Sequence, residues 1–280
     1  MRGVLFALTL TSALTAPLAA VAADRILSIG GSVTEILYSL GVADKLVARD
    51  TTSSFPPAAE ALPDVGYMRA LAPEGVLSVN PDLIVAEAGA GPVETLEVLK
   101  EAEIAFVEVP DEFTPDGILA KIRAVGAAVE VDPEPLVRDV EAGLDTVAAK
   151  VATVPVEDRK KVLFILSTRG GRIMASGRGT AADGIIAMAG GVNALAEFDG
   201  YKLMTDEAVS QAAPDVILMM DRGGDHGAPD AELLAMPALV TTPAAESGAV
   251  VRMNGLYLLG FGPRTADAAL ELAQSLYGPL

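Results

Sequence analysis

The sequence predicts an α/β protein made of two similar lobes that a single long helix joins. Strand-like apolar runs alternate with helical stretches, a pattern typical of a mainly parallel sheet covered by helices. A segment that begins with Gly66-Tyr67 recurs in a degraded copy that begins with Gly200-Tyr201, which indicates an internal duplication. Between the two copies, residues 133–154 have the apolar spacing of one amphipathic helix.

The first lobe is expected to open with a strand, a tight turn and a helix. Residues 25–29 are apolar, Gly30-Gly31-Ser32 favours a turn, and residues 33–40 have helical spacing that ends at Gly41. Further strands are expected at 46–48, 82–86 and 104–109, and further helices at 92–102 and 114–129.

Residues 133–154 predict the connection between the lobes. Their apolar residues recur every three or four positions, and prolines stand at both edges. Such a helix is about 30 Å long, which suits a stiff spacer; the alternative is an ordinary crossover helix inside one domain. The second lobe is expected to contain strands at 161–166, 215–220 and 249–253, a loop rich in Gly and Arg up to Gly179, and helices that begin at Thr180 and span 263–277.

The repeat continues beyond the two tyrosines. Glu74 is followed seven residues later by Pro81-Asp82-Leu83, and Glu207 is followed at the same distance by Pro214-Asp215-Val216. Each copy is therefore expected to form a loop, a short helix with Glu in its first turn, and a buried strand. Corresponding Gly-Tyr loops and glutamates on the two lobes would flank a cleft between them.

The first residues have the pattern of a secretory signal peptide. Arg2 precedes an apolar run, and small residues follow at Ala20-Val21-Ala22. We therefore expect a signal peptide at 1–23, an N-terminal lobe at 24–131, a linker helix at 132–155 and a C-terminal lobe at 156–280, with the mature protein in the periplasm.

Composition excludes several classes of function. The chain contains no cysteine, so it has no disulfide framework, thiolate metal site or cysteine nucleophile. Its formal net charge is −18 at pH 7, which disfavours nucleic acid as a partner. The expected protein is an acidic monomer.

Residue types also disfavour an enzyme. His226 is the single histidine, so neither a Ser-His-Asp triad nor a site with several histidine ligands is easily built. Gly30-Gly31 and Gly170-Gly171 follow predicted strands, but neither pair completes the dinucleotide-binding pattern. We expect no catalytic residues, with an exported α/β hydrolase as the alternative from another class.

Five arginines in predicted loops indicate an anionic ligand. Loops after the strands of α/β sheets line the binding crevice, and guanidinium groups match carboxylates with paired donors. The alternative is that each arginine is a solvated surface charge. The five are Arg69, Arg169, Arg172, Arg178 and Arg222.

Tyr67 is the candidate metal ligand. A phenolate is a hard oxygen donor that suits ferric iron, including haem iron. Iron must displace the phenol proton, and Arg69 or Arg222 would supply a cation that favours this loss. The alternative is a tyrosine that packs its ring at the edge of the lobe.

These motifs resemble the periplasmic haem-binding proteins of bacterial ABC haem importers. The resemblance covers essentially the whole chain after the signal peptide. It implies the class III periplasmic binding protein fold, in which one long helix joins two Rossmann-like lobes with little hinge motion, and it implies ferric haem as the transported ligand and an inner-membrane permease as partner. The motifs that carry it are Val65-Gly66-Tyr67-Met68-Arg69, Glu74-Gly75, Pro81-Asp82-Leu83, Gly200-Tyr201-Lys202, Glu207-Ala208 and Ala213-Pro214-Asp215.

The resemblance also implies roles for particular residues. Tyr67 would be the axial ligand of haem iron. The remaining implied roles are tyrosinate or propionate support by Arg69, Arg222 and Arg169, lining of the cleft by Met68, Tyr201 and Arg178, and docking to the permease by Glu74 and Glu207.

One stretch departs from the family pattern. Some members supply a histidine as sixth ligand after the first strand of the second lobe, where this chain has Ser167-Thr168-Arg169-Gly170-Gly171. Five-coordinate iron is therefore expected, with His226 or Tyr201 as alternative sixth ligands. A cobalamin or ferric-siderophore carrier is the alternative with the same fold.

Overall fold

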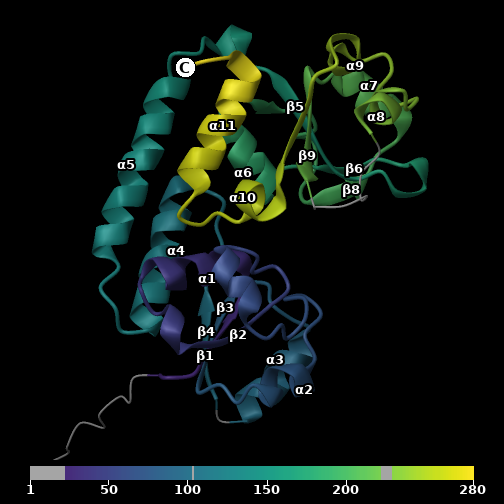
Figure 1. Cartoon of the computed structure of the whole chain (residues 1–280). Coiled ribbons are helices and arrows are strands. Elements are labelled where there is room, and N and C mark those ends of the chain that lie inside the picture. The colour runs from purple at the N-terminus through teal and green to yellow at the C-terminus, as the bar shows by residue number, and fades with distance from the viewer. Residues whose placement is uncertain (1–22, 103, 222–228) are drawn as a thin grey trace, which may run out of the picture.

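The structure, a computed structural model, describes residues 23–102, 104–221 and 229–280. It consists of two α/β lobes, each built on its own sheet, and the long helix α5 (Glu134–Val151) runs along one side of the molecule between them (Figure 1). The fold predicted from the sequence, two α/β lobes joined by one long helix, is confirmed.

The first lobe contains a four-stranded parallel sheet in the order β2-β1-β3-β4. The central strands β1 and β3 are buried along their whole length because helices cover both faces of the sheet. The strands are β1 (Ile26–Ile29), β2 (Leu46–Arg49), β3 (Leu83–Glu87) and β4 (Ala105–Val109), and the helices are α1 (Gly31–Ser39), η1 (Ala43–Lys45), η2 (Pro57–Ala61), α2 (Pro73–Ser78), α3 (Val93–Glu101) and α4 (Pro115–Ala128).

The described part of the second lobe contains a six-stranded mixed sheet in the order β10-β9-β5-β6-β8, with β7 beside β5. Its strands are β5 (Lys161–Ser167), β6 (Met174–Ser176), β7 (Val192–Asn193), β8 (Tyr201–Leu203), β9 (Val216–Asp221) and β10 (Val250–Asn254). Its helices are η3 (Val156–Asp158), η4 (Arg169–Gly171), α6 (Ala181–Met188), α7 (Asp206–Ala212), α8 (Asp230–Leu234), α9 (Pro243–Ser247), α10 (Gly255–Leu259) and α11 (Thr265–Tyr277).

Two short antiparallel strands, β6 and β8, lie where the sequence predicted loops. Tyr201 belongs to β8 and pairs with Ser176 of β6, whereas Tyr67 lies in a loop. Strands of three residues carry too little periodicity to be distinguished from a loop by sequence. The two copies of the repeat therefore differ in local structure around their tyrosines.

A single hydrophobic cluster runs through both lobes and the linker. The apolar face of α5 is buried in this cluster at the predicted positions. Each fully buried aliphatic side chain stabilises the folded state by roughly 1.5–3 kcal/mol. This cluster joins the two lobes, and each lobe also has a smaller hydrophobic cluster of its own on the other face of its sheet. Representative members are Val85 of β3, Ile122 of α4, Leu144 of α5, Ile185 of α6 and Leu272 of α11.

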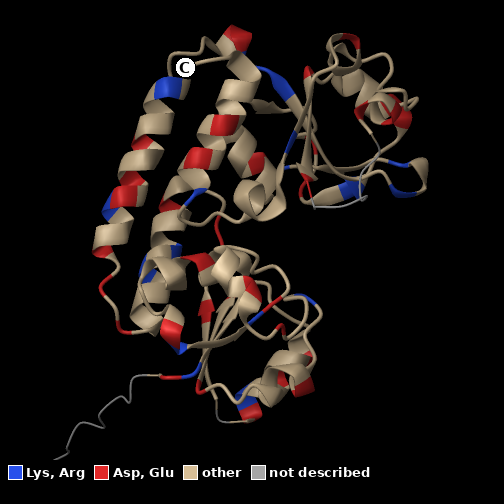
Figure 2. Cartoon of the chain, in the orientation of Figure 1, with Lys and Arg blue, Asp and Glu red and all other residues tan. Residues whose placement is uncertain are grey.

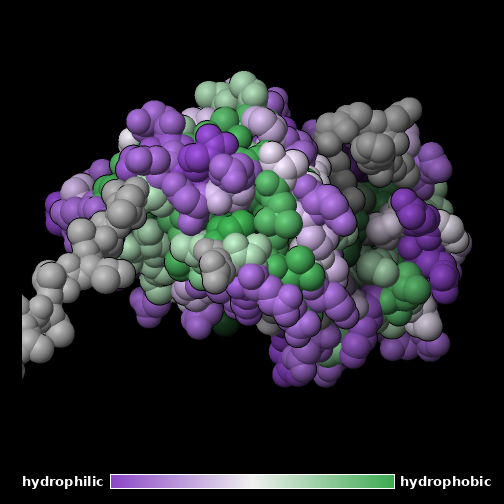
Figure 3. Space-filling view, turned by 90° about the horizontal axis from the view of Figure 1, so that it is seen from below, coloured by the Kyte–Doolittle hydropathy of each residue, from purple (hydrophilic) through white to green (hydrophobic). Residues whose placement is uncertain are grey.

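The surface is predominantly polar. Acidic residues are spread over α5, α11 and the outer ends of both lobes, whereas several basic residues gather around β6 and β8 (Figure 2). Seen from below, hydrophilic residues dominate the periphery, with hydrophobic residues gathered nearer the middle of the face (Figure 3). Within the described residues, none of the helices combines the length and the apolarity that crossing a membrane requires.

Candidate functional site

The segments that follow the strands of one lobe pack against those of the other. Gly31, just after β1, lies so close to Leu256 of α10 that the contact leaves no room for a Cβ. Phe113, after β4, packs edge-on against Phe261 with ring centroids 5.2 Å apart. Ligands of α/β proteins bind beyond the carboxyl ends of the strands, so the region beside these contacts is the candidate site.

A buried lysine forms the polar centre of this lobe contact. Lys121 Nζ of α4 donates hydrogen bonds to Asp111 Oδ1 at 2.5 Å, to Ser32 Oγ at 3.1 Å and to the backbone oxygen of Gly260, in the other lobe, at 3.2 Å. Glu87 Oε2 lies 3.6 Å from Nζ and also accepts a hydrogen bond from Ser32. Burial raises the pKa of Glu87 and outweighs the opposing effect of Lys121.

The backbone around Tyr67 is held on both sides while its ring remains accessible. Gly66 adopts a φ of 103°, a conformation that favours glycine. After the tyrosine, the Ala70 N–H donates to the Tyr67 carbonyl at 2.8 Å, and the Gly91 N–H donates to the Met68 carbonyl at 2.9 Å. The Tyr67 side chain is nevertheless 43% exposed. The loop therefore presents a phenol from a fixed backbone.

Arg69 lies against the Tyr67 hydroxyl. Its Nη1 donates a hydrogen bond to the phenol oxygen at 3.0 Å. Partial burial lowers the pKa of Arg69, but the Tyr67 contact and the nearby Glu87 and Asp111 carboxylates outweigh it and raise that pKa above its ordinary value. The guanidinium thus stands beside the phenol oxygen as a charged hydrogen-bond donor.

Tyr201 presents its ring rather than its hydroxyl. The ring is 39% exposed and packs edge-on against Phe164, with centroids 6.4 Å apart. Its hydroxyl contacts Thr180, the N-cap of α6. Burial raises the pKa of Tyr201, although the charge of Arg69 in the other lobe opposes that rise. Of the two tyrosines, Tyr67 is the one whose hydroxyl has a guanidinium as its hydrogen-bond partner.

Met68 does not line the site, contrary to the sequence prediction. It is 3% exposed and packs in the hydrophobic core beneath the loop, in a cluster with Leu27, Leu71 and Leu99. Residues 67–70 form a turn closed by the Ala70 N–H and the Tyr67 carbonyl, and this turn leaves Tyr67 exposed while Met68 is buried.

The other predicted arginines lie in the second lobe or outside the described residues. Arg169 and Arg172 are exposed in the turn before β6, and Arg178 follows β6, where its Nε pairs with Asp199 Oδ1 at 3.2 Å. These residues contribute to the basic region around β6 and β8 in Figure 2. Arg222 and His226 lie outside the described residues, as do residues 1–22 of the predicted signal peptide.

The two predicted docking glutamates occupy equivalent helices. Glu74 lies in the first turn of α2 and Glu207 in the first turn of α7, and both side chains are exposed. In Figure 1, α2 and α7 lie at the outer ends of the two lobes, on the side away from α5. Glu74 therefore lies on the first lobe and Glu207 at the equivalent place on the second.

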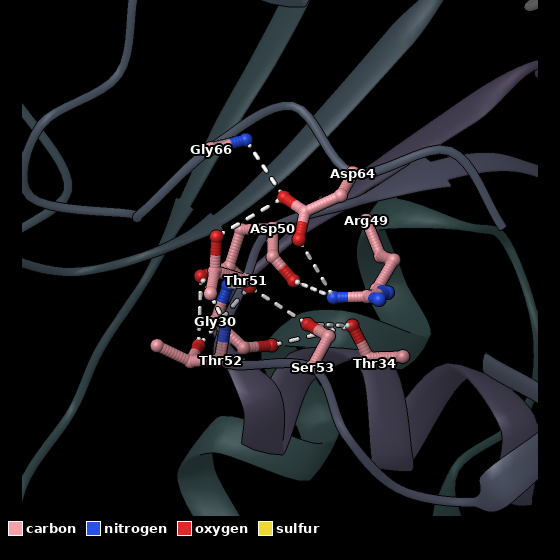
Figure 4. Close-up of polar contacts among 9 residues, drawn as sticks. All are labelled: Gly30, Thr34, Arg49, Asp50, Thr51, Thr52, Ser53, Asp64 and Gly66. Carbon is pink, nitrogen blue, oxygen red and sulfur yellow. Dashed lines mark hydrogen bonds and ion pairs between the residues drawn. The ribbon is translucent and has the colours of Figure 1, made fainter. Parts of the chain in front are cut away.

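Sequence reasoning missed two aspartates beside the Tyr67 loop, which Figure 4 shows with their partners. Asp50 is fully buried and accepts hydrogen bonds from the Gly30 N–H at 3.0 Å and from the Ser53 hydroxyl at 2.7 Å. Asp64 accepts a hydrogen bond from the Gly66 N–H at 2.8 Å. An available signal was the position of Asp50 two residues after the strand predicted at 46–48.

The described residues contain no group of three or more His, Cys, Asp or Glu side chains placed to hold a metal ion. Tyr67 presents a single phenol oxygen beside the Arg69 guanidinium. Such a donor set fits an iron whose other ligands come from elsewhere, as in a porphyrin.

Comparison with known proteins supports a ligand-binding role for this fold. A family model described as periplasmic binding protein matches residues 26–255. The solved structure of the periplasmic heme-binding protein BhuT in complex with two hemes is 40% identical, with a TM-score of 0.83, and the match covers 90% of this chain and 97% of BhuT.

Two curated relatives extend the comparison. The ABC transporter substrate-binding lipoprotein YvrC of Bacillus subtilis (strain 168) is 27% identical over 257 residues, which cover 90% of this chain and 80% of YvrC. The vitamin B12-binding protein of Yersinia pestis (strain Pestoides F) is 40% identical, but over 93 residues that cover 33% of this chain and 32% of that protein.

Proposed function

This chain belongs to the periplasmic binding protein family, and we propose that it captures ferric haem between its lobes and delivers it to an ABC permease. The family is one of substrate-binding proteins rather than enzymes, so the proposal concerns capture and release and not turnover. The observation that carries it is the half-exposed Tyr67, whose hydroxyl accepts a hydrogen bond from Arg69 at 3.0 Å.

The Tyr67 and Arg69 pair fits the iron of haem. One lone pair of the phenol oxygen faces Arg69, which leaves another for iron. Because the guanidinium stabilises the phenolate, iron can displace the proton at a lower cost. Arg69, Arg169 and Arg222 are the proposed partners of the tyrosinate and the propionates, and Arg178 is proposed to line the cleft. A five-coordinate iron needs no second protein ligand.

The ring of Tyr201 and the side chain of Leu203 are the proposed apolar wall for the macrocycle. The two residues are separated by one position on β8, so they lie on the same face of the strand. Both are unusually exposed for their size, at 39% and 47%. Haem is apolar across its faces and anionic at one edge, so this wall beside basic loops is complementary to it.

A cobalamin carrier is the second candidate. The observation that favours it is the 40% identity to a vitamin B12-binding protein over 93 residues. Such a carrier would use the same region without a bond between Tyr67 and iron. The proposed setting in either case is a monomer in the periplasm, with a permease that Glu74 and Glu207 contact.

An absorption titration of the protein with ferric haem tests the proposal. Wild type and Tyr201→Phe should give a saturable Soret change and the charge-transfer bands of a high-spin tyrosinate complex, whereas Tyr67→Phe should lose those bands and bind haem more weakly. A Tyr67→Phe spectrum identical to wild type overturns the assignment of the ligand. Absence of saturable haem binding by wild type, together with saturable cobalamin binding, overturns haem in favour of cobalamin.

A further inference from the structure

We propose that Asp64 is a positioning residue that sets the direction of the Tyr67 phenol through the peptide of Gly66. This inference rests on the proposed function, in which Tyr67 is the iron ligand. Asp64 acts through the backbone of the loop and does not contact the phenol itself.

The carboxylate of Asp64 accepts hydrogen bonds from its own loop and from the end of β2 (Figure 4). Its Oδ1 accepts hydrogen bonds from the Gly66 N–H at 2.8 Å and from the Thr51 hydroxyl at 3.1 Å. Its Oδ2 accepts from Arg49 Nη1 at 3.1 Å, and the same Nη1 donates to the Asp50 carbonyl at 3.0 Å. The side chain thus ties the Tyr67 loop to the end of β2.

Both sides of Gly66 are held from this end of β2. Asp64 accepts from its N–H, and the Gly66 carbonyl accepts from the Thr51 N–H at 3.0 Å. That carbonyl belongs to the peptide unit that precedes Tyr67. Gly66 has a φ of 103°, and a Cβ at this residue would meet no atom within 4 Å. Neighbouring side chains therefore do not confine Gly66 sterically, and its hydrogen bonds are what fix its orientation.

The segment that holds Gly66 is itself anchored in the core. Asp50 is fully buried, and its carboxylate accepts hydrogen bonds from the Thr52 N–H at 3.0 Å, the Ser53 hydroxyl at 2.7 Å and the Gly30 N–H at 3.0 Å. The Ser53 hydroxyl also bonds to Thr34 of α1 at 2.6 Å. Residues 50–53, whose Thr51 N–H holds the peptide before Tyr67, are thus themselves tied to the interior of the lobe through Gly30 and Thr34.

The consequence is a phenol whose direction is set before iron arrives. A ligand that already points toward its metal loses less conformational freedom on binding, and the contact of Tyr67 with Arg69 depends on the same orientation. Partners that orient a metal ligand typically change metal affinity by about 10- to 100-fold when they are removed. Asp64 is thus expected to affect haem retention without touching haem.

The test compares Asp64→Ala and Asp64→Asn with Asp82→Ala in the full chain. Asp82 is a matched control because it is also exposed and accepts two backbone hydrogen bonds, from Asp24 and Arg25 at 3.0 Å each, at the opposite end of the sheet. Haem release to apomyoglobin, the tyrosinate charge-transfer bands and the circular dichroism spectrum are measured for each protein.

Asp64→Ala should fold, because the side chain lies on the surface, but should release haem about tenfold faster with altered charge-transfer bands. Asp64→Asn, which keeps an acceptor for the Gly66 N–H, should recover most of the retention, and Asp82→Ala should match wild type. If Asp64→Ala releases haem at the wild-type rate and has wild-type charge-transfer bands, while Tyr67→Phe still loses those bands, only the positioning role is overturned. Wild-type bands that do not depend on Tyr67 overturn the proposed ligand instead.

Discussion

Arg264 and Glu35 join the two lobes through a pair of parallel hydrogen bonds. Arg264 Nε donates to Glu35 Oε1 and Arg264 Nη2 donates to Glu35 Oε2, each at 2.9 Å. Glu35 lies in α1 of the first lobe, and Arg264 precedes α11 of the second. The guanidinium also stacks on Phe55, 3.5 Å from the ring centroid. This contact, like that of Lys121 with Gly260, fixes one lobe against the other on the side of the site.

Glu35→Gln should destabilise the protein by about 2–3 kcal/mol, because it replaces two charge-assisted hydrogen bonds at a nearly buried position. Urea unfolding followed by circular dichroism measures the effect. The matched control is Glu134→Gln, which removes an Arg–Glu pair of similar geometry with Arg123 on the exposed surface, where little change is expected. Equal losses in the two variants would contradict a special role for the lobe contact.

Lys121→Met should destabilise the protein by about 3–5 kcal/mol. The substitution retains an apolar stem of similar length but leaves the buried Asp111 and Glu87 carboxylates without their cation. Lys45→Met is the control, since Lys45 forms a more exposed pair with Asp24 at 3.6 Å. Chemical unfolding of both variants is the measurement, and a Lys121→Met protein as stable as wild type would show that the lysine is dispensable for holding the lobes together.

Glu87 should make stability depend on pH in a definite direction. Burial raises its pKa in the folded protein above the ordinary value of 4.5, so between these two values the folded state holds more protons than the unfolded state. The stability that Glu87 contributes is therefore complete below about pH 4.5 and is lost as the pH rises through the folded pKa.

Glu87→Gln carries no titratable group at this position and escapes that loss. Its free energy of unfolding relative to wild type should therefore increase between pH 4 and pH 7. Unfolding curves of both proteins at the two pH values provide the comparison. If the free energy of unfolding of Glu87→Gln minus that of wild type stays constant or decreases as the pH rises, the pKa of Glu87 is not raised in the folded protein.

Features encoded by local pattern or by self-similarity could be predicted from the sequence. The spacing of apolar residues predicted the buried face of α5. The internal repeat predicted two lobes, with Glu74 and Glu207 in corresponding first helical turns. Because Tyr67 and Arg69 are two residues apart, the sequence predicted that they lie close together. It did not predict the hydrogen bond between their side chains.

Contacts that depend on convergence of distant segments could not be predicted in this way. Lys121 meets Asp111, Ser32 and Gly260 from separate elements, and spacing along the chain does not encode that meeting. Its position in an apolar stripe of α4, between Ile118 and Ile122, was nevertheless a signal that a lysine there needs buried partners. The burial of Met68 depends on the turn at residues 67–70, which the sequence pattern did not predict.

Gly66→Ala should weaken haem binding through the backbone. An alanine at a φ of 103° is strained even though its Cβ meets no neighbour, so the peptide before Tyr67 is expected to rotate. Gly41→Ala is the control because Gly41 has a φ of 77° and equally open surroundings at the end of α1. Both variants should lose about 1–2 kcal/mol of stability, but only Gly66→Ala should change the haem absorption bands; identical bands in both would contradict a fixed Tyr67 backbone.

Glu74→Ala combined with Glu207→Ala should impair haem delivery while sparing haem binding. Both glutamates are exposed, and they belong to α2 and α7, which lie at the outer ends of the two lobes (Figure 1). A glutamate in a first helical turn also stabilises its helix through the helix dipole, so loss of stability alone could mimic a docking defect.

The control for that effect is Glu94→Ala combined with Glu232→Ala, which removes one exposed first-turn glutamate from each lobe at α3 and α8. Haem titration and haem uptake by the permease reconstituted in vesicles are measured for both double variants. Because docking requires particular positions whereas the dipole effect does not, only the variant at Glu74 and Glu207 should lose uptake. Equal uptake by the two double variants would remove the docking role from these glutamates.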